Sequence, residues 1–316
     1  METIRNTQKK KGSDFRIRCA RDFSKNKYIY LMLLPVLLYF IMFCYVPMYG
    51  ALIAFKDYKV ASGVWGSQWV GFKWFVRFFN DYTFLRVLKN TLIISAENIL
   101  WGFPAPIILA LLMNELTNSK FKRVVQTVTY LPHFVSMVVV CSIITAFFSR
   151  DGVVTKFFTL FGMEATNMLA VPGYFRSIYI GTGIWQTVGW GTIVYLSALT
   201  AIDPQQYEAA TIEGASKFKQ VLHITLPGIA PTITIMLILR VGQIMNVGYE
   251  KILLLYSPLT YETADIISTY VYRIGVLEGV QYSYSAAIGL FQSAVNLILI
   301  IVTNAVSRKI SETSLW

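Results

Sequence analysis

Long apolar runs with almost no charge are the feature that most constrains this chain. A helix needs about 20 mainly apolar residues to cross a bilayer, and six segments qualify: 28–50, 90–113, 127–148, 175–199, 228–248 and 283–305. Only 14% of the residues are charged, against roughly a quarter in soluble proteins. Scarce charge and 15% aromatic residues also exclude a disordered chain. The sequence therefore predicts an all-α membrane protein with six transmembrane helices.

The positions of Lys and Arg predict the orientation of these helices. Nine of the 28 basic residues precede residue 28, and cytoplasmic segments carry the excess of positive charge in membrane proteins. We therefore expect both termini in the cytoplasm. The predicted organisation is a basic cytoplasmic arm (1–27), a six-span domain (28–305) and a short cytoplasmic tail (306–316). The first apolar run is too long for a signal-peptide core and stays in the protein.

The basic arm also limits the partners that the sequence predicts. A polar arm leading into a span is typical of a topology signal that contacts anionic lipid headgroups; contact with an ATPase or regulator is the alternative. The net charge of +11 does not indicate nucleic-acid binding, because no folded basic groove is visible. The outside loop 51–89 is rich in aromatic residues, which fits an interfacial belt or a docking surface for a soluble partner.

The chain lacks the motifs of an enzyme or a metal site. Its three cysteines and two histidines are widely separated, which excludes a disulfide framework and makes a zinc centre improbable. No phosphate-binding loop of the pattern G-x-x-x-x-G-K-[ST] occurs in the sequence. We therefore expect no catalytic residue and no cofactor in this chain.

The inside segment 203–227 is the most informative stretch. Asp203 followed by Pro204 predicts a helix start, and Tyr207, Ala210 and Thr211 share one helical face. Gly214 interrupts the helix, and a second short helix follows, from Ala215 to about residue 224. The residues alone fit either a pair of helices for a partner's groove or an interfacial helix that separates two spans.

The motif in this segment resembles a known family. Glu208-Ala209-Ala210, Gly214 and then Ile224-x-Leu226-Pro227 resemble the EAA loop of binding-protein-dependent ABC importer permeases. Trp69-Val70-Gly71-Phe72, Asn90-Thr91 and Leu131-Pro132 are similar to the maltose-type carbohydrate branch. The basic arm and the run from Tyr130 to Ser136 resemble the subgroup that takes up oligosaccharides of plant or algal polysaccharides.

The resemblance implies a type I ABC importer permease in the bacterial cytoplasmic membrane. It implies that ATP-driven alternating access moves a carbohydrate, namely an oligosaccharide, into the cell. Its partners would be a second homologous permease in a heterodimer, two ATP-binding subunits that hold ATP and Mg, and an extracytoplasmic solute-binding protein. The residues that would couple to the ATPase are Glu208, Ala209, Ala210, Gly214, Ala215, Leu226 and Pro227. Two alternatives remain: the same machine for an amino acid, phosphonate or metal chelate, and a non-transporting sensor or anchor.

Polar residues within the spans predict the translocation path. Ionisable groups at membrane depth are costly and usually face a cavity or pair with one another. Amides and aromatic rings also suit a sugar, so the candidates are Glu97, Gln186, Trp190, Tyr195, Arg240, Gln243, Asn246, Gln292 and Asn296. Ordinary hydrogen bonding between helices is the competing interpretation for each of them. Arg240 would suit the carboxylate of an acidic sugar, unless it pairs with Glu97.

Overall fold

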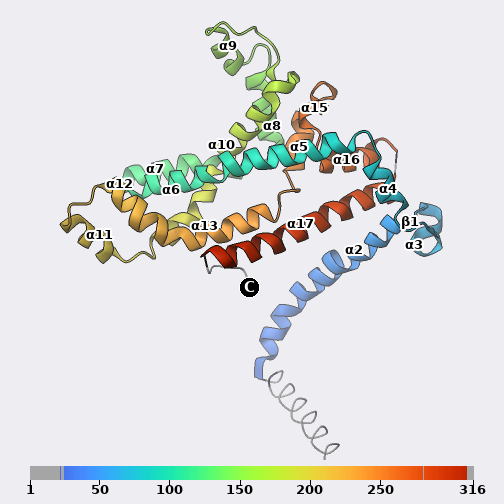
Figure 1. Cartoon of the computed structure of the whole chain (residues 1–316), viewed down its shortest axis with the longest axis horizontal. Coiled ribbons are helices and arrows are strands. Elements are labelled where there is room, and N and C mark those ends of the chain that lie inside the picture. The colour runs from blue at the N-terminus through green and yellow to red at the C-terminus, as the bar shows by residue number, and fades with distance from the viewer. Residues whose placement is uncertain (1–21, 23–24, 280, 312–316) are drawn as a thin grey trace, which may run out of the picture. The chain divides into compact units, whose positions relative to one another are not determined.

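The computed structural model describes residues 22, 25–279 and 281–311. The predicted basic arm (1–27) lies almost wholly outside these residues, and the predicted tail (306–316) lies partly outside them. The chain divides into two compact units, Met1–Gly71 and Phe72–Trp316. Most of the described residues are helical (Figure 1).

The described part of the first unit is one long helix followed by a small hairpin. The helix runs from Lys25 to Phe55, and none of the residues in its most apolar stretch is buried. Strands β1 and β2 pair antiparallel, with Lys56 opposite Trp69, and the ring of Trp69 stacks on Phe55 with centroids 5.7 Å apart. The labelled elements of this unit are η1 (Ile41–Tyr45), α2 (Val46–Met48), η2 (Tyr49–Phe55), β1 (Lys56–Asp57), η3 (Val60–Ser62), α3 (Gly63–Gly66) and β2 (Gln68–Trp69).

The second unit contains the remaining helices. Its first half comprises α4 (Lys73–Phe79), α5 (Phe84–Glu97), η4 (Asn98–Gly102), α6 (Pro104–Asn114), α7 (Ser119–Tyr130), η5 (Leu131–Phe134), α8 (Met137–Phe148), α9 (Val153–Thr159), η6 (Met168–Ala170) and α10 (Pro172–Leu199). Its second half comprises α11 (Pro204–Ile212), α12 (Lys217–Gln220), η7 (Val221–Thr225), α13 (Leu226–Val241), α14 (Tyr249–Leu255), η8 (Pro258–Thr260), α15 (Tyr261–Ala264), α16 (Ile267–Tyr272), η9 (Arg273–Leu277) and α17 (Tyr282–Ser311).

Five helices in the described residues are long and apolar enough to cross a membrane. They are Lys25–Phe55, Phe84–Asn114, Met137–Thr159, Lys217–Val241 and Tyr282–Lys309. Five of the six predicted spans therefore overlap one of these helices, but the predicted span 127–148 is interrupted between Tyr130 and Met137, where Pro132 follows the end of α7, and the long helix there is Met137–Thr159. The remaining predicted span, 175–199, corresponds to α10, which is 28 residues long but carries glycine, threonine and glutamine in its middle. The fold is thus a mostly helical membrane bundle.

Helix α10 lies at the centre of the second unit. It packs against α6, α7, α13 and α15, and Figure 1 shows it passing behind α5 and α6. Two glycines make this close packing possible. A Cβ at Gly189 would lie 2.2 Å from the carbonyl oxygen of Thr129, and one at Gly191 would lie 2.9 Å from Pro106. At Gly189 the backbone of α10 therefore meets the backbone of α7, and at Gly191 it meets the ring of Pro106 in α6, with no room for a methyl group at either position.

Several of the long helices are interrupted. Wide π-helical turns occur at Asn98–Gly102, inside the span that contains α5 and α6, and at Val221–Thr225, directly before Pro227 of α13. A proline lacks an N–H and crowds the carbonyl of the preceding turn, which a widened turn relieves. Helix α13 ends at Val241, and residues 242–248 are irregular, although the apolar pattern predicts a span that runs to 248.

A buried ion-pair cluster fixes the segment between α13 and α17. The carboxylate of Asp265 is fully buried and accepts hydrogen bonds from both terminal nitrogens of Arg273, at 3.2 and 2.6 Å. Arg86 approaches the same carboxylate at 3.4 Å. Burial alone would lower the pKa of Arg273, but its hydrogen bonds to Asp265 and the carboxylate charge outweigh burial and raise it. The cluster ties α5 to η9.

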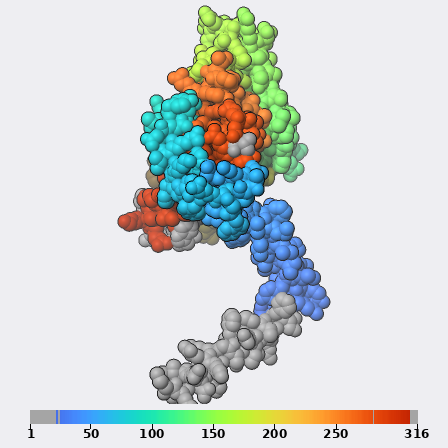
Figure 2. Space-filling view, turned by 90° about the vertical axis from the view of Figure 1, so that its right-hand side faces the viewer, coloured from blue at the N-terminus to red at the C-terminus, as the bar shows by residue number. Residues whose placement is uncertain are grey.

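Some aromatic residues of the loop 51–89 are buried in the protein core instead of forming an interfacial belt. Phe78 of α4 is 1% exposed and packs edge-on against Phe84 and Phe291. Tyr82, in contrast, is 91% exposed. In the second unit, α9 projects beyond the other helices of that unit in both views (Figures 1 and 2). Phe157 in α9 and Phe161 shortly after it are exposed.

Candidate functional site

The predicted coupling segment folds as two helices that meet at Gly214. Asp203 caps α11 by accepting a hydrogen bond from the backbone N–H of Gln205 at 2.9 Å, as its position before Pro204 predicts. At the other end, the N–H of Ala215 donates to the carbonyl of Ala210, and the N–H of Gly214 donates to Thr211. This pattern closes a helix with a left-handed residue, and Gly214 has a φ of +77°.

Side chains on one face hold the two helices together. The hydroxyl of Tyr207 lies 3.0 Å from that of Thr225, and the amide of Gln220 donates to the hydroxyl of Thr211 at 3.0 Å. These contacts confirm that Tyr207 and Thr211 share the packing face. Gln220 also donates to the carbonyl of Ala215 at 3.2 Å. The bend at Gly214 is therefore braced on its inner side.

The opposite side of this segment is exposed. Glu208 and Ala209 are exposed on α11, while Ala210 and Ala215 are half-buried. Two apolar side chains outside the predicted coupling residues also face outward: Ile212 is 88% exposed and Phe218 is 76% exposed. The predicted second short helix does not end near residue 224. It continues through η7 into α13, so that one helix runs from Lys217 to Val241.

The far end of that helix reaches a polar cavity in the bundle. Two adjoining cavities, of about 70 and about 270 Å³, share Asn98, Arg240 and Gly248; we call them together the polar cavity. Asn98 is near the midpoint of the span Phe84–Asn114, and Gln186, which lines the larger cavity, is near the midpoint of α10. The polar cavity therefore lies at about half the depth of the bundle.

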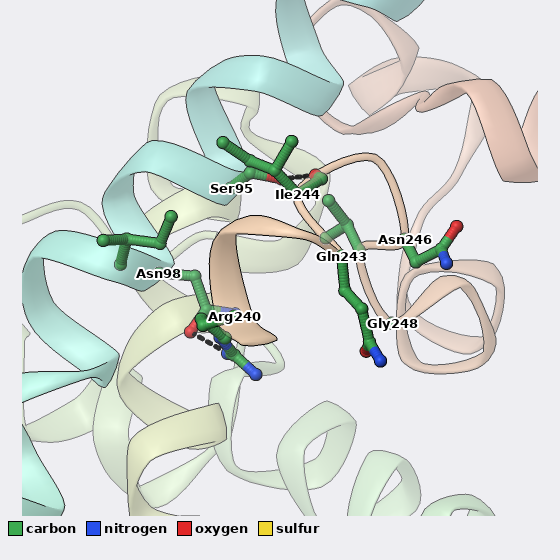
Figure 3. A pocket seen from close by; sticks show the side chains of 9 residues that line it. Ser95, Asn98, Arg240, Gln243, Ile244, Asn246 and Gly248 are labelled. Carbon is green, nitrogen blue, oxygen red and sulfur yellow. Dashed lines mark hydrogen bonds between the residues drawn. The ribbon is translucent and has the colours of Figure 1, made fainter. Parts of the chain in front are cut away.

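Arg240 and the irregular segment after α13 form one wall. Figure 3 shows Arg240 reaching toward Asn98, and its guanidinium donates to the amide oxygen of Asn98 at 2.7 Å. No ion pair joins Arg240 to Glu97 in the described part of the chain, and Glu97 is half-buried. Gln243 and Asn246 also line the smaller cavity, where Figure 3 shows both side chains beside the turn that follows α13.

Gln292 and Asn296 support this irregular segment from α17. The amide of Gln292 donates to the carbonyl of Met245 at 2.5 Å and to the side chain of Asn246 at 2.8 Å. The side-chain oxygen of Asn296 accepts from the N–H of Met245 at 3.1 Å. Unwound backbone at membrane depth needs such partners. These two residues therefore make interhelical hydrogen bonds, the competing interpretation in the sequence analysis.

The remaining path candidates on α10 differ from one another. Gln186 is 6% exposed and lines the larger cavity. Trp190 stacks on His133 with ring centroids 4.5 Å apart and planes at 4°. Tyr195 is 4% exposed and belongs to an apolar core cluster with Ile107 and Ile229. Only Gln186 of these three contributes to the polar cavity.

Lys251 is a residue of the cavity that sequence reasoning missed. It is 4% exposed, and its ammonium donates to the carbonyl of Tyr179 at 3.0 Å and to the hydroxyl of Thr182 at 2.8 Å. Burial lowers the pKa of Lys251 to about 8. The one available signal was a single lysine directly before the apolar run Ile252 to Leu255. The sequence around Lys251 predicts an outside loop, and its contact with α10 is visible only in the folded structure.

A bundle of membrane-crossing helices around a polar cavity, with an exposed helix pair at one end, is an arrangement that suits a membrane transport subunit. The chain belongs to the family described as "binding-protein-dependent transport system inner membrane component", whose pattern matches residues 102–312. The predicted family is thereby confirmed.

Individual relatives narrow the family further. Protein LplB of Bacillus subtilis is 46% identical over 92% of each chain. The polygalacturonan/rhamnogalacturonan transport system permease protein YteP of Bacillus subtilis is 45% identical over 92% of this chain and 91% of its own. A chain of a bacterial ABC transporter involved in the import of the acidic polysaccharide alginate superposes with a TM-score of 0.85 at 42% identity, over 93% of this chain and 99% of that one. The predicted function is confirmed: the chain is a permease subunit of an ABC importer of the oligosaccharide type.

Proposed function

We propose that the chain forms one half of a translocation path, paired with a second homologous permease subunit in a heterodimer. In this proposal α10 is the sixth span. Its 28 residues extend over about 42 Å at 1.5 Å per residue, which exceeds the roughly 30 Å of a hydrocarbon core. Both termini lie in the cytoplasm, as the concentration of basic residues before residue 28 favours.

The coupling role rests on the geometry of residues 203–227. The exposed side chains of Glu208, Ile212 and Phe218 lie on the helix pair that is bent at Gly214. Exposed apolar side chains beside a charge favour a surface that a partner covers. In our proposal each of two ATP-binding subunits, which hold ATP and Mg, receives one such helix pair. Glu208 contacts a basic residue there, and the small side chains of Ala209 and Ala210 permit close approach.

One continuous helix supplies the mechanical link. It begins at Lys217 in the coupling segment and reaches Val241, next to Arg240 in the wall of the polar cavity. When the ATP-binding subunits close, a shift of the coupling segment moves this helix as a lever. The polar cavity then opens to alternate sides, a rigid-body transition about an interface. The hydrogen bonds of Gln292 and Asn296 keep the irregular segment beyond Val241 intact during this movement.

The cargo is delivered from outside by a solute-binding protein. One of the solved structures that resemble this chain, with a TM-score of 0.85, is an alginate transporter in complex with an alginate pentasaccharide-bound periplasmic protein. YteP is a polygalacturonan/rhamnogalacturonan permease. Both relatives support an oligosaccharide as the cargo of this chain. Asn98, Gln186 and Gln243 supply amides for sugar hydroxyls along the polar cavity.

A matched pair of charge reversals tests the coupling role. Glu208→Lys and Glu213→Lys make the same change at exposed positions five residues apart on the same segment. We expect Glu208→Lys to lose co-purification with the ATP-binding subunits and oligosaccharide-stimulated ATP hydrolysis in the assembled importer. Glu213→Lys should keep both. Equal behaviour of the two variants would remove Glu208 from the coupling contact, and ATP hydrolysis that no solute stimulates in the wild type would favour a sensor or anchor instead.

A further inference from the structure

We propose that the polar cavity binds a carboxylate through Arg240 and Lys251, so that the cargo of the importer is an acidic, uronate-containing oligosaccharide. This inference rests on the proposed function, because it names the substrate class of the same translocation path.

The charged residues that line the larger cavity are all basic. Arg240 comes from the end of α13 and Lys251 from α14, and none of the other lining residues is acidic. Within the residues that the structure describes, neither cation has a carboxylate within 4.0 Å. Glu97 and Glu250 neighbour lining residues in the sequence, but neither contributes to the cavity wall. The cavity therefore holds two basic groups without a counter-charge from the protein.

The burial of Lys251 is costly unless a ligand supplies a counter-charge. A cation removed from water loses several kcal/mol of hydration, and an oppositely charged partner is the usual compensation. Lys251 is 4% exposed, and two neutral oxygens, from Tyr179 and Thr182, are its hydrogen-bond partners. A neutral sugar would leave the buried charge of Lys251 uncompensated, whereas the exposed guanidinium of Arg240 keeps contact with water. A carboxylate would supply the missing charge each time the cargo passes.

The donors that remain fit a carboxylate. The bonds of Lys251 use two of the three N–H groups of its ammonium, and the bond to Asn98 uses part of the planar guanidinium fork of Arg240. A fork of this kind binds carboxylates with paired hydrogen bonds. At Gly183 a Cβ would lie 3.5 Å from the ammonium nitrogen, so the absence of a side chain there leaves space beside it.

The N-terminal end of a helix lies in the wall of the same cavity. Met137, the first residue of the 12-residue helix α8, lines the same cavity. The first turn of a helix presents free N–H groups and a partial positive charge. Asn98, Gln186 and Thr187 surround these groups with neutral hydrogen-bonding side chains. The wall thus combines carboxylate partners with partners for sugar hydroxyls.

The test uses the assembled importer in proteoliposomes, with its partner permease, ATP-binding subunits and binding protein. The probes are short oligogalacturonates and oligomannuronates, each beside its carboxyl-reduced, neutral counterpart. We expect the wild type to import an acidic probe. Arg240→Met and Lys251→Met should each lower that uptake by about tenfold or more, because a hydrogen bond to a charged group contributes about 1.5–3 kcal/mol. Lys156→Met, which removes an exposed lysine of α9, should leave uptake unchanged.

The outcomes separate this inference from the proposed function. Import of carboxyl-reduced probes alone, or equal loss of acidic and neutral uptake in both variants, would overturn the carboxylate site while leaving an oligosaccharide importer. Failure of every probe to stimulate ATP hydrolysis would overturn the importer function itself. Arg240 is exposed and its replacement leaves the core intact, and Lys251→Arg should restore acidic uptake in part if the charge at α14 is what matters.

Discussion

The left-handed backbone at Gly214 allows a prediction whose size follows from the structure. A Cβ added at Gly214 meets no atom within 4 Å, so a substitution there introduces no clash. Its φ of +77° is nevertheless a conformation that costs an ordinary L-residue about 1–2 kcal/mol. If the ATP-binding subunit accepts only the bent form, Gly214→Ala and Gly214→Leu should weaken docking by roughly 5- to 30-fold. Gly214→Asn should cost less, because asparagine tolerates the left-handed region.

The assay for this series is the affinity of the ATP-binding subunit for the permease pair in detergent, with solute uptake per ATP hydrolysed as a second readout. Gly173→Ala is the control, because its Cβ also meets no atom within 4 Å and its φ is not positive. Wild-type affinity for Gly214→Ala would refute the reasoning. Equal losses of affinity for Gly214→Asn and Gly214→Ala would also refute it, because the left-handed backbone predicts a smaller loss for asparagine.

Two further predictions concern stability. Gln292→Leu leaves the carbonyl of Met245 without its amide partner and should destabilise the bundle by about 1–3 kcal/mol, measured by thermal unfolding in detergent, whereas Ser293→Ala on the exposed side of α17 should have little effect. At Asp81, burial alone would raise the pKa, but hydrogen bonds from Thr83, Tyr284 and Tyr270 outweigh it and lower the pKa. The stability that the Asp81 charge contributes is therefore present above the usual carboxyl pKa of about 4 and is lost as the pH falls through the lowered value. We expect the difference in melting temperature between the wild type and Asp81→Asn to shrink at acid pH. A difference that grows as the pH falls would contradict this direction.

Much of the bundle was predictable because lipid imposes a simple requirement on sequence. Apolar runs long enough to cross a bilayer located five membrane-crossing helices and also α10. Where the helix of residues 217–241 ends was not predictable. Ile244, Met245 and Val247 continue the apolar pattern beyond Val241, yet the backbone there is irregular. Its partners, Gln292 and Asn296, are about 50 residues further along, which no local pattern reveals.

The candidate site was predictable to different extents at its two ends. The coupling segment depends on short-range signals, such as Asp203 before a proline and Gly214 at a bend, and both have the predicted local structure. The polar cavity depends on contacts between distant segments. Arg240 was singled out because charge is rare inside a span, but Lys251 lies outside every apolar run and enters the cavity only through its contact with Tyr179 and Thr182 of α10.

The wide turn at Asn98–Gly102 has a consequence for how the two halves of its span relate to each other. A π-helical turn holds one residue more than an α-helical turn, and each residue advances a helix by about 100°. The face that α6 presents, with Ile107, Ala110 and Met113 buried, is thus set about a quarter-turn away from the continuation of α5. A one-residue deletion within 98–102 would leave hydropathy and length nearly unchanged. It would nevertheless rotate those three side chains away from their neighbours. The number of residues between α5 and α6 therefore determines which face of α6 is buried.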